Sequence, residues 1–357
     1  MGEDGMSQAA NLGDRRRGWP IRHWAWLVWT TVLVVLSPLG LHVAAAEDKV
    51  EPPLQLEAKI PLGDVRGRID HMAIDLKRQR LFVAELENDS VGVIDLANHR
   101  VIRTLTDLRQ PQGIAYLATT DVWYVANAGD GSVRLFRGSD YSPIGRIELG
   151  EDADYIRVNA AGTRVMIGHG NGSLAVLDPS SRVKVGDVPL KAHPEGFQID
   201  DSSGRVVINL PDDHSIVVVD DASLKQIARW STRDLAANFP MALDQDRRNV
   251  LVAFRRPARL GAFSVEDGSV VATTPICGDA DDVFVDQKRR RAYVSCGEGF
   301  IDILDLRSAA YPRIARIPTI SGARTSLFVP ALDLFLLAAR THAGQPAGVW
   351  IFRPVSE

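Results

Sequence analysis

The 357-residue sequence predicts an all-β protein built from repeated four-stranded units. Short runs rich in Val and Ile recur along the chain and are bounded by turn residues, which is typical of strands rather than helices. The stretch RLFVAELENDSVGVIDL at 80–96 returns in a similar form as RAYVSCGEGFIDILDL at 291–306. A pattern that recurs within one chain marks a repeated structural unit, so the repeats decide the fold.

Seven copies of one template align on a single apolar column at intervals of 41 to 44 residues. The column consists of Met72, Ile114, Ile156, Phe197, Met241, Val283 and, in a weaker seventh copy, Ser326. Each complete copy holds four short strands separated by turns. A repeat of about 40 to 45 residues with four strands is the period of a β-propeller blade. The sequence therefore predicts one domain over 47–357, a seven-bladed β-propeller of four-stranded antiparallel blades, with repeats starting near 70, 112, 154, 195, 239, 281 and 324.

The last copy ends without a fourth strand, and the chain stops five residues after GVWIF at 348–352. The segment LEAKIPLG at 56–63 is similar to the fourth-strand sequence IGRIELG at 144–150 and has no other partner in the repeat pattern. A propeller must close its ring, because an open terminal blade leaves an unpaired sheet edge. We therefore expect a strand at 56–62 to complete the last blade.

Residues 1–46 have a different character from the repeats. Four arginines, at 15–17 and 22, precede the uncharged apolar run WAWLVWTTVLVVL, and small residues follow up to AAA at 44–46. This order is typical of a secretory signal peptide. The alternative is an uncleaved membrane anchor, because residues 24–46 could nearly span a bilayer. The sequence thus predicts an exported protein, periplasmic or extracellular.

Charge and cysteine content limit the partners and the compartment. The net charge of −4 makes nucleic acid an unexpected partner, since nucleic-acid-binding domains are normally basic. Contact with a membrane is expected only through the N-terminal segment, if it stays uncleaved. Cys277 and Cys296 are the two cysteines, and an even pair in an oxidising compartment predicts a disulfide between them.

The motif YVAN at 124–127, with PQGIAY before it and GDGSVRLF after it, resembles the YVTN repeat of bacterial and archaeal β-propellers, often described as YncE-like. The stretch FVAELENDSVGVIDLANHRVIRTL is equally similar to that template. The resemblance covers residues 54–357 and implies a seven-bladed periplasmic or surface protein. It implies no particular chemistry, because this kind of fold carries many unrelated sites.

The residues just before the apolar column are the candidate ligand-binding residues. If each first strand lines the central channel, these positions meet at one channel mouth, where loops on a rigid frame usually carry function. They are Asp70, His71, Gln112, Asp154, Glu195, Asp281, Asp282 and Arg324. The set is acidic and contains histidine, so we expect it to bind a protein or small-molecule ligand.

A divalent metal ion is one possible occupant of this mouth. Asp70, His71, Glu195 and Asp281 would supply carboxylate oxygens and an imidazole nitrogen. The alternative is a water-filled channel with a polar rim, because no metal-ligand spacing such as HExxH or CxxC occurs.

The turns on the opposite face carry basic residues, among them Arg78, Arg164 and Arg289. Charged turn residues need no partner, and we expect these side chains to be solvated.

Three functions remain open at this level. The leading hypothesis is a binding or interaction module, with no catalytic residue assigned. The alternatives are a metal-dependent lactonase-like hydrolase and an accessory protein of periplasmic redox metabolism. The chain has no GxSxG nucleophile motif and no CxxCH haem-attachment motif, so serine hydrolysis of that type and a c-type haem of its own are not expected.

Overall fold

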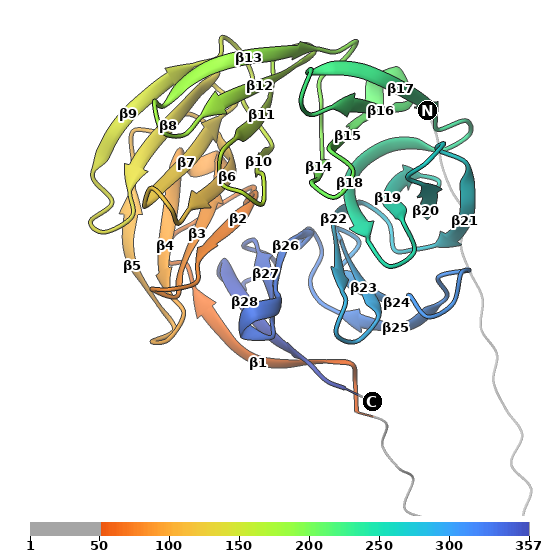
Figure 1. The fold of residues 1–357 in the computed structure, drawn as a ribbon. Helices are drawn as coiled ribbons and strands as arrows, with labels where there is room; N and C mark the ends of the chain where they lie inside the picture. Colours follow the sequence, from red (N-terminus) through yellow and green to blue (C-terminus); the bar gives the residue numbers. More distant parts are fainter. Residues whose placement is uncertain (1–50, 357) are drawn as a thin grey trace, which may run out of the picture. The chain divides into compact units, whose positions relative to one another are not determined.

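The computed structural model describes residues 51–356, and these residues form seven four-stranded antiparallel sheets arranged around a common centre (Figure 1). The protein is a seven-bladed β-propeller, as the repeats predict. The predicted signal peptide or anchor at 1–46 lies outside the described residues. No helix within 51–356 is long and apolar enough to cross a membrane.

The blades follow one another along the chain. Blade 1 holds β2 (Met72–Asp75), β3 (Arg80–Glu85), β4 (Ser90–Asp95) and β5 (Arg100–Leu105). Blade 2 holds β6 (Pro111–Leu117), β7 (Val122–Asn127), β8 (Ser132–Arg137) and β9 (Pro143–Glu148). Blade 3 holds β10 (Ile156–Val158), β11 (Val165–His169), β12 (Ser173–Asp178) and β13 (Val183–Pro189). Blade 4 holds β14 (Phe197–Asp200), β15 (Arg205–Leu210), β16 (Ser215–Asp220) and β17 (Lys225–Ser231).

The remaining blades have the same plan. Blade 5 holds β18 (Ala236–Asp244), β19 (Asn249–Arg256), β20 (Ala258–Ser264) and β21 (Val270–Pro275). Blade 6 holds β22 (Ala280–Asp286), β23 (Arg291–Cys296), β24 (Phe300–Asp305) and β25 (Arg313–Pro318). Blade 7 holds β26 (Thr325–Val329), β27 (Leu334–Ala339), β28 (Gly348–Pro354) and the N-terminal β1 (Leu54–Pro61). Three short 3₁₀ turns, η1 (Leu86–Asn88), η2 (Pro211–Asp213) and η3 (Pro330–Leu332), lie in loops between strands.

The seven blades are equivalent residue by residue. In every blade the residue of the apolar column pairs with the residue eleven positions further along the chain. The pairs are Met72 with Val83, Ile114 with Val125, Ile156 with Ile167, Phe197 with Ile208, Met241 with Val252, Val283 with Val294 and Ser326 with Leu337. The weak seventh copy is therefore in register with the other six. First strands of successive blades contact one another all the way round, and β26 also contacts β2.

The hydrophobic core consists of layers between neighbouring blades. Seven clusters of buried side chains each join two adjacent sheets. On β3, Leu81 and Val83 belong to the cluster shared with blade 7, whereas Phe82 and Ala84 belong to the cluster shared with blade 2. Alternate residues of a strand point to opposite faces, and both faces are covered here. This double burial explains why the second strands are apolar throughout.

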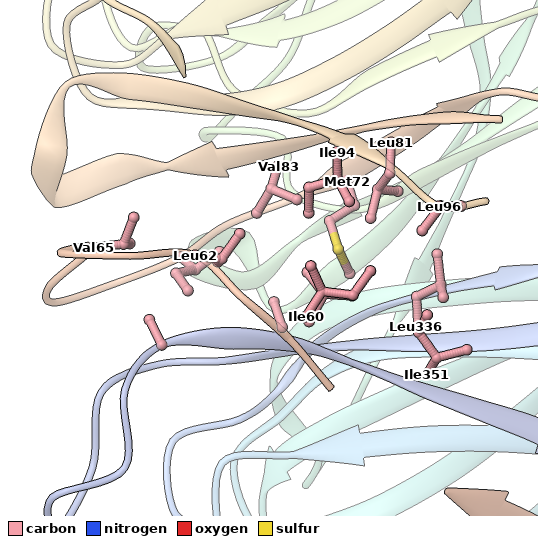
Figure 2. Close-up of a cluster of buried hydrophobic side chains, with 14 of the residues drawn as sticks. Ile60, Leu62, Val65, Met72, Leu81, Val83, Ile94, Leu96, Leu336 and Ile351 are labelled. Carbon is pink, nitrogen blue, oxygen red and sulfur yellow. The ribbon is translucent and has the colours of Figure 1, made fainter. Parts of the chain in front are cut away.

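The N-terminal strand β1 is the outermost strand of blade 7. It pairs antiparallel with β28 from Leu54 opposite Pro354 to Pro61 opposite Gly348, slightly earlier in the sequence than the expected 56–62. Figure 2 shows Ile60 among side chains from both blades that meet at this junction, including Met72 and Leu336. The first and last parts of the propeller thus share one buried layer.

The outer strand of every blade carries one register shift opposite the middle of the third strand. In β1 the shift lies between Leu56 and Ala58, so β1 has the geometry of the other outer strands. In other blades the skipped residue is a β-branched residue exposed to solvent, for example Val185 at 60% and Ile227 at 53%. A bulge twists an edge strand and blocks pairing with another sheet, so we attribute protection of the outer edges to these shifts.

All three of the basic turn residues Arg78, Arg164 and Arg289 join neighbouring blades, and Arg164 of blade 3 donates to the Asp221 carboxylate of blade 4 at 2.8 Å. Arg289 of blade 6 donates to Asp333 of blade 7 at 2.6 and 2.7 Å and to the carbonyl oxygen of Pro354 at 2.9 Å. Arg78 of blade 1 likewise donates to Asp121 of blade 2 at 2.8 and 3.1 Å. The expectation of solvated side chains is wrong for all three, because each guanidinium reaches a carboxylate on the next blade.

A disulfide joins Cys277 and Cys296 within blade 6, with a Cα–Cα distance of 5.8 Å. Cys277 lies just before β22, and Cys296 is the last residue of β23. The bridge thus links the entry to the first strand with the end of the second.

The closure of the ring by β1 can be tested within that single strand. Ile60 is fully buried, whereas 47% of the Leu56 surface is exposed. We expect Ile60→Ala to lower the free energy of unfolding by about 3 kcal/mol, because it leaves a cavity between blades 7 and 1. Leu56→Ala, the matched control, should change it by about 0.5 kcal/mol or less. Urea denaturation measures both, and equal effects would contradict the burial of β1.

Candidate functional site

A cavity of about 210 Å³ lies where the first strands begin, and residues of all seven blades line it. The shared register explains this convergence, because it places the start of each first strand on the same face. Seven of the eight predicted ligand-binding residues line this cavity: Asp70, His71, Gln112, Asp154, Glu195, Asp281 and Arg324. The lining also includes Arg68, Asp152 and His193, which the sequence did not single out, and Arg255, which the repeat pattern places on this face in the turn after a second strand.

The eighth predicted residue, Asp282, lies against a smaller neighbouring cavity of about 30 Å³. His71 and Tyr155 line both cavities and contact each other edge to face, with ring centroids 4.7 Å apart. The Asp282 carboxylate accepts a hydrogen bond from the backbone N–H of Ser326 at 2.7 Å. Asp282 is therefore held at the neighbouring cavity, and His71 is the one other predicted residue that lines that cavity.

On one side of the main cavity the carboxylates are paired with arginines. Arg68 lies 2.7 Å from Asp70, and Arg324 lies 2.9 Å from Asp281. Arg255 also contacts Asp281, and both Arg255 and Arg324 contact Asp279, at 3.2 and 2.8 Å. These three arginines balance these three aspartates, so this side, here called the paired side, has no excess charge.

The other side of the cavity, formed by blades 3 and 4, is here called the acidic side. Asp152, Asp154 and Glu195 share it with a single imidazole, that of His193. The Nδ1 atom of His193 lies 2.6 Å from the carbonyl oxygen of Gly170, and its Nε2 atom lies 3.7 Å from a carboxylate oxygen of Asp154. No arginine or lysine among residues 51–356 forms an ion pair with Asp154 or Glu195.

Gly113 sets how closely blade 2 approaches the acidic side. A Cβ atom at this position would lie 1.9 Å from the carbonyl oxygen of Asp154. Only glycine allows this approach of two backbones. Gly113, in the first strand of blade 2, therefore helps to fix the position of Asp154.

The protonation of the acidic side reflects burial and mutual repulsion. Burial raises the pKa of Glu195 to about 8, and the neighbouring Asp154 adds to the shift. Burial opposes protonation of His193, but the Asp154 carboxylate and the Gly170 carbonyl outweigh it and raise its pKa to about 9. A buried carboxyl that resists ionisation and an imidazole that favours its cation both indicate an excess of negative potential.

The structure groups the possible metal ligands differently from the sequence-based set. Within residues 51–356 one group of three or more such side chains has its ligand atoms within 4.8 Å of one another: Asp154, His193 and Glu195. Of the four predicted ligands Asp70, His71, Glu195 and Asp281, only Glu195 belongs to it. Asp70 and Asp281 are instead held by the arginines of the paired side.

His193 is the residue that sequence reasoning missed. It stands two positions before Glu195 in the stretch HPEG at 193–196, outside the two positions inspected before each apolar column. An imidazole two residues before a carboxylate, at the turn into a first strand, was the available signal. Arg68 carried no such signal, because it lies before the repeat positions and pairs with Asp70 two residues further along the chain.

Comparison with known proteins shows the fold. No protein-family model matches the chain, and no curated protein matches it. Among solved structures, a chain of Kuenenia stuttgartiensis hydrazine synthase is similar, with a TM-score of 0.72 and 17% identity, over 80% of this chain and 96% of that chain. This similarity agrees with the propeller architecture. The resemblance to the YVTN family stays a prediction.

Asp282, beside the neighbouring cavity, is expected to make the stability of the protein depend on pH. Burial raises the pKa of Asp282 to about 7, with His71 opposing the shift and Asp281 adding to it. The folded protein then binds this proton more tightly than the unfolded chain, so stability falls as pH rises from about 4 through about 7. Asparagine cannot titrate, so in Asp282→Asn we expect the free energy of unfolding to fall by up to about 4 kcal/mol less over this pH range than in the wild-type protein. Denaturation at a series of pH values measures it.

The exposed Asp246, whose side chain is 62% accessible, provides the matched control for this substitution. Asp246→Asn should leave the pH dependence of stability as it is in the wild-type protein. If Asp282→Asn also leaves it unchanged, Asp282 is not the group that titrates.

Proposed function

We propose that the protein is an exported binding module that holds a small cationic ligand at the mouth of its central channel. The observation that carries the proposal is the unequal distribution of charge in the cavity. On the paired side every carboxylate meets a guanidinium. On the acidic side three carboxylates face one imidazole.

The energetics of burial favour a cation at this place. Grouping carboxylates in a partly desolvated cavity is costly unless a positive charge compensates them. Protonation of His193 compensates one of the three, and Glu195, whose pKa is raised to about 8, is mostly neutral at pH 7. A bound cation would compensate the remainder, and an anion would meet arginines that already have partners.

The polar lining favours a hydrophilic ligand over an apolar one. Among the fifteen residues around the cavity, ten are Asp, Glu, Arg or His. The frame that presents them is rigid, because each first strand contacts the first strands of both neighbouring blades. A preformed site of this kind loses little entropy on binding, which suits recognition of a small ligand.

Export remains part of the proposal. The disulfide between Cys277 and Cys296 supports it, since such bridges persist in oxidising compartments. N-terminal sequencing of the protein isolated from its own cells tests cleavage near residue 46. The hydrolase and redox alternatives stay predictions of the sequence.

Calorimetric titration with two probes, putrescine as an organic dication and Zn²⁺ as a metal ion, tests the function. We expect at least one probe to bind, and Glu195→Gln to weaken that binding by about tenfold, equivalent to about 1.4 kcal/mol. The matched control is Glu148→Gln, the same chemical change at a side chain that is 63% exposed on the outer strand β9. Failure of both probes to bind, or equal effects of the two variants, would refute the proposal.

A further inference from the structure

We infer that Asp154, His193 and Glu195 form a binding site for one divalent transition-metal ion, with coordination positions left open toward the cavity. The inference rests on the proposed function and names its cationic ligand more closely. It also differs from the four-residue set that the sequence suggested, because two of those residues are held by arginines.

The three side chains converge from adjacent blades. Asp154 lies just before β10, whereas His193 and Glu195 lie just before β14. One ligand atom from each lies within 4.8 Å of the others. Around a tetrahedral zinc ion with bonds of about 2.1 Å, donor atoms stand about 3.4 Å apart.

The hydrogen bond of His193 orients its imidazole in the way that is usual for a metal-binding histidine. Its Nδ1–H donates to the carbonyl oxygen of Gly170 at 2.6 Å, so Nε2 is the ring nitrogen left to bind a metal ion, which would displace the proton that Nε2 carries in the cationic imidazole. A backbone carbonyl bonded to the second ring nitrogen is the usual arrangement of a metal-binding histidine. The Nε2 atom also lies 3.7 Å from a carboxylate oxygen of Asp154. A cation between them would satisfy both.

The Asp154 carboxylate provides a second, independent observation. Its side chain is only 10% exposed, and its buried Oδ1 atom has no hydrogen-bond partner among the described residues. An unsatisfied buried carboxylate oxygen is costly, and most buried polar atoms have a partner. A metal ion coordinated by Asp154 would supply the missing interaction.

The donor set indicates the class of metal. Imidazole with carboxylates suits zinc and neighbouring transition metals. Calcium takes six to eight oxygen ligands, which three side chains including an imidazole do not provide. Three protein ligands beside an open cavity leave at least one position for water or a small ligand, as in metal sites that bind exogenous molecules.

Titration of the chelator-treated full-length protein with Zn²⁺, and with Co²⁺ followed by its visible absorption, tests the inference. We expect one equivalent of metal to bind. His193→Ala should weaken binding by more than about 100-fold, since loss of an outer-shell partner alone costs about 10- to 100-fold. Asp154→Asn, which keeps the side-chain shape, should also weaken it and change the Co²⁺ spectrum. Circular dichroism checks that each variant is folded.

The matched control is His99→Ala, which removes an exposed imidazole outside the cavity and should leave metal affinity within about threefold. His71→Ala, which removes the other imidazole of the cavity, should weaken binding less than His193→Ala does. No metal binding, or binding that depends on His71 rather than His193, would overturn the inference. If putrescine then still binds in a Glu195-dependent way, the proposed function stands without the metal. If neither cation binds, both fail.

Discussion

The pairing of β1 with β28 is the constraint on which the rest of the structure depends. Each blade buries its faces only against its two neighbours, so the core exists as seven layers rather than one centre. Blades 7 and 1 can form their layer only if a strand from the start of the chain completes the last sheet. Ile60 enters that layer from β1, while Met72 and Leu336 enter it from the two blades that it joins. Like the outer strands of the other six blades, β1 carries one register shift.

The closed ring also determines where chemistry can occur. One register in all seven blades brings the starts of the first strands to a single mouth. Because the seven sequences differ at those positions, the mouth is not symmetrical. Arg68, Arg255 and Arg324 neutralise the part near blades 6, 7 and 1, and the part near blades 3 and 4 keeps its negative charge. A regular scaffold thus presents an asymmetric site, in which Asp154, His193 and Glu195 are the side chains free to take a cation.

The sequence predicts the backbone of this protein far better than its side-chain contacts. Repeat period and strand pattern are local properties, and they place even the atypical Ser326 opposite Leu337. They also predict which residues reach the mouth. They do not predict that Arg289 crosses to Asp333, or that Asp281 is held by Arg324, because those contacts join residues more than 40 positions apart in sequence. His193 was missed for a different reason: a local signal existed, but His193 lies two positions before Glu195, outside the pair of positions just before the apolar column.

Native-state hydrogen exchange of the β1 amides tests the closure of the ring most directly. Strands in a cooperative core exchange only through global unfolding, whereas a loosely attached terminal strand exchanges through local opening. The account predicts that amides of β1 paired with β28, such as that of Ile60, are protected with the same free energy as amides of β27. Much faster exchange of the β1 amides, while the amides of the other strands stay protected, would contradict the account.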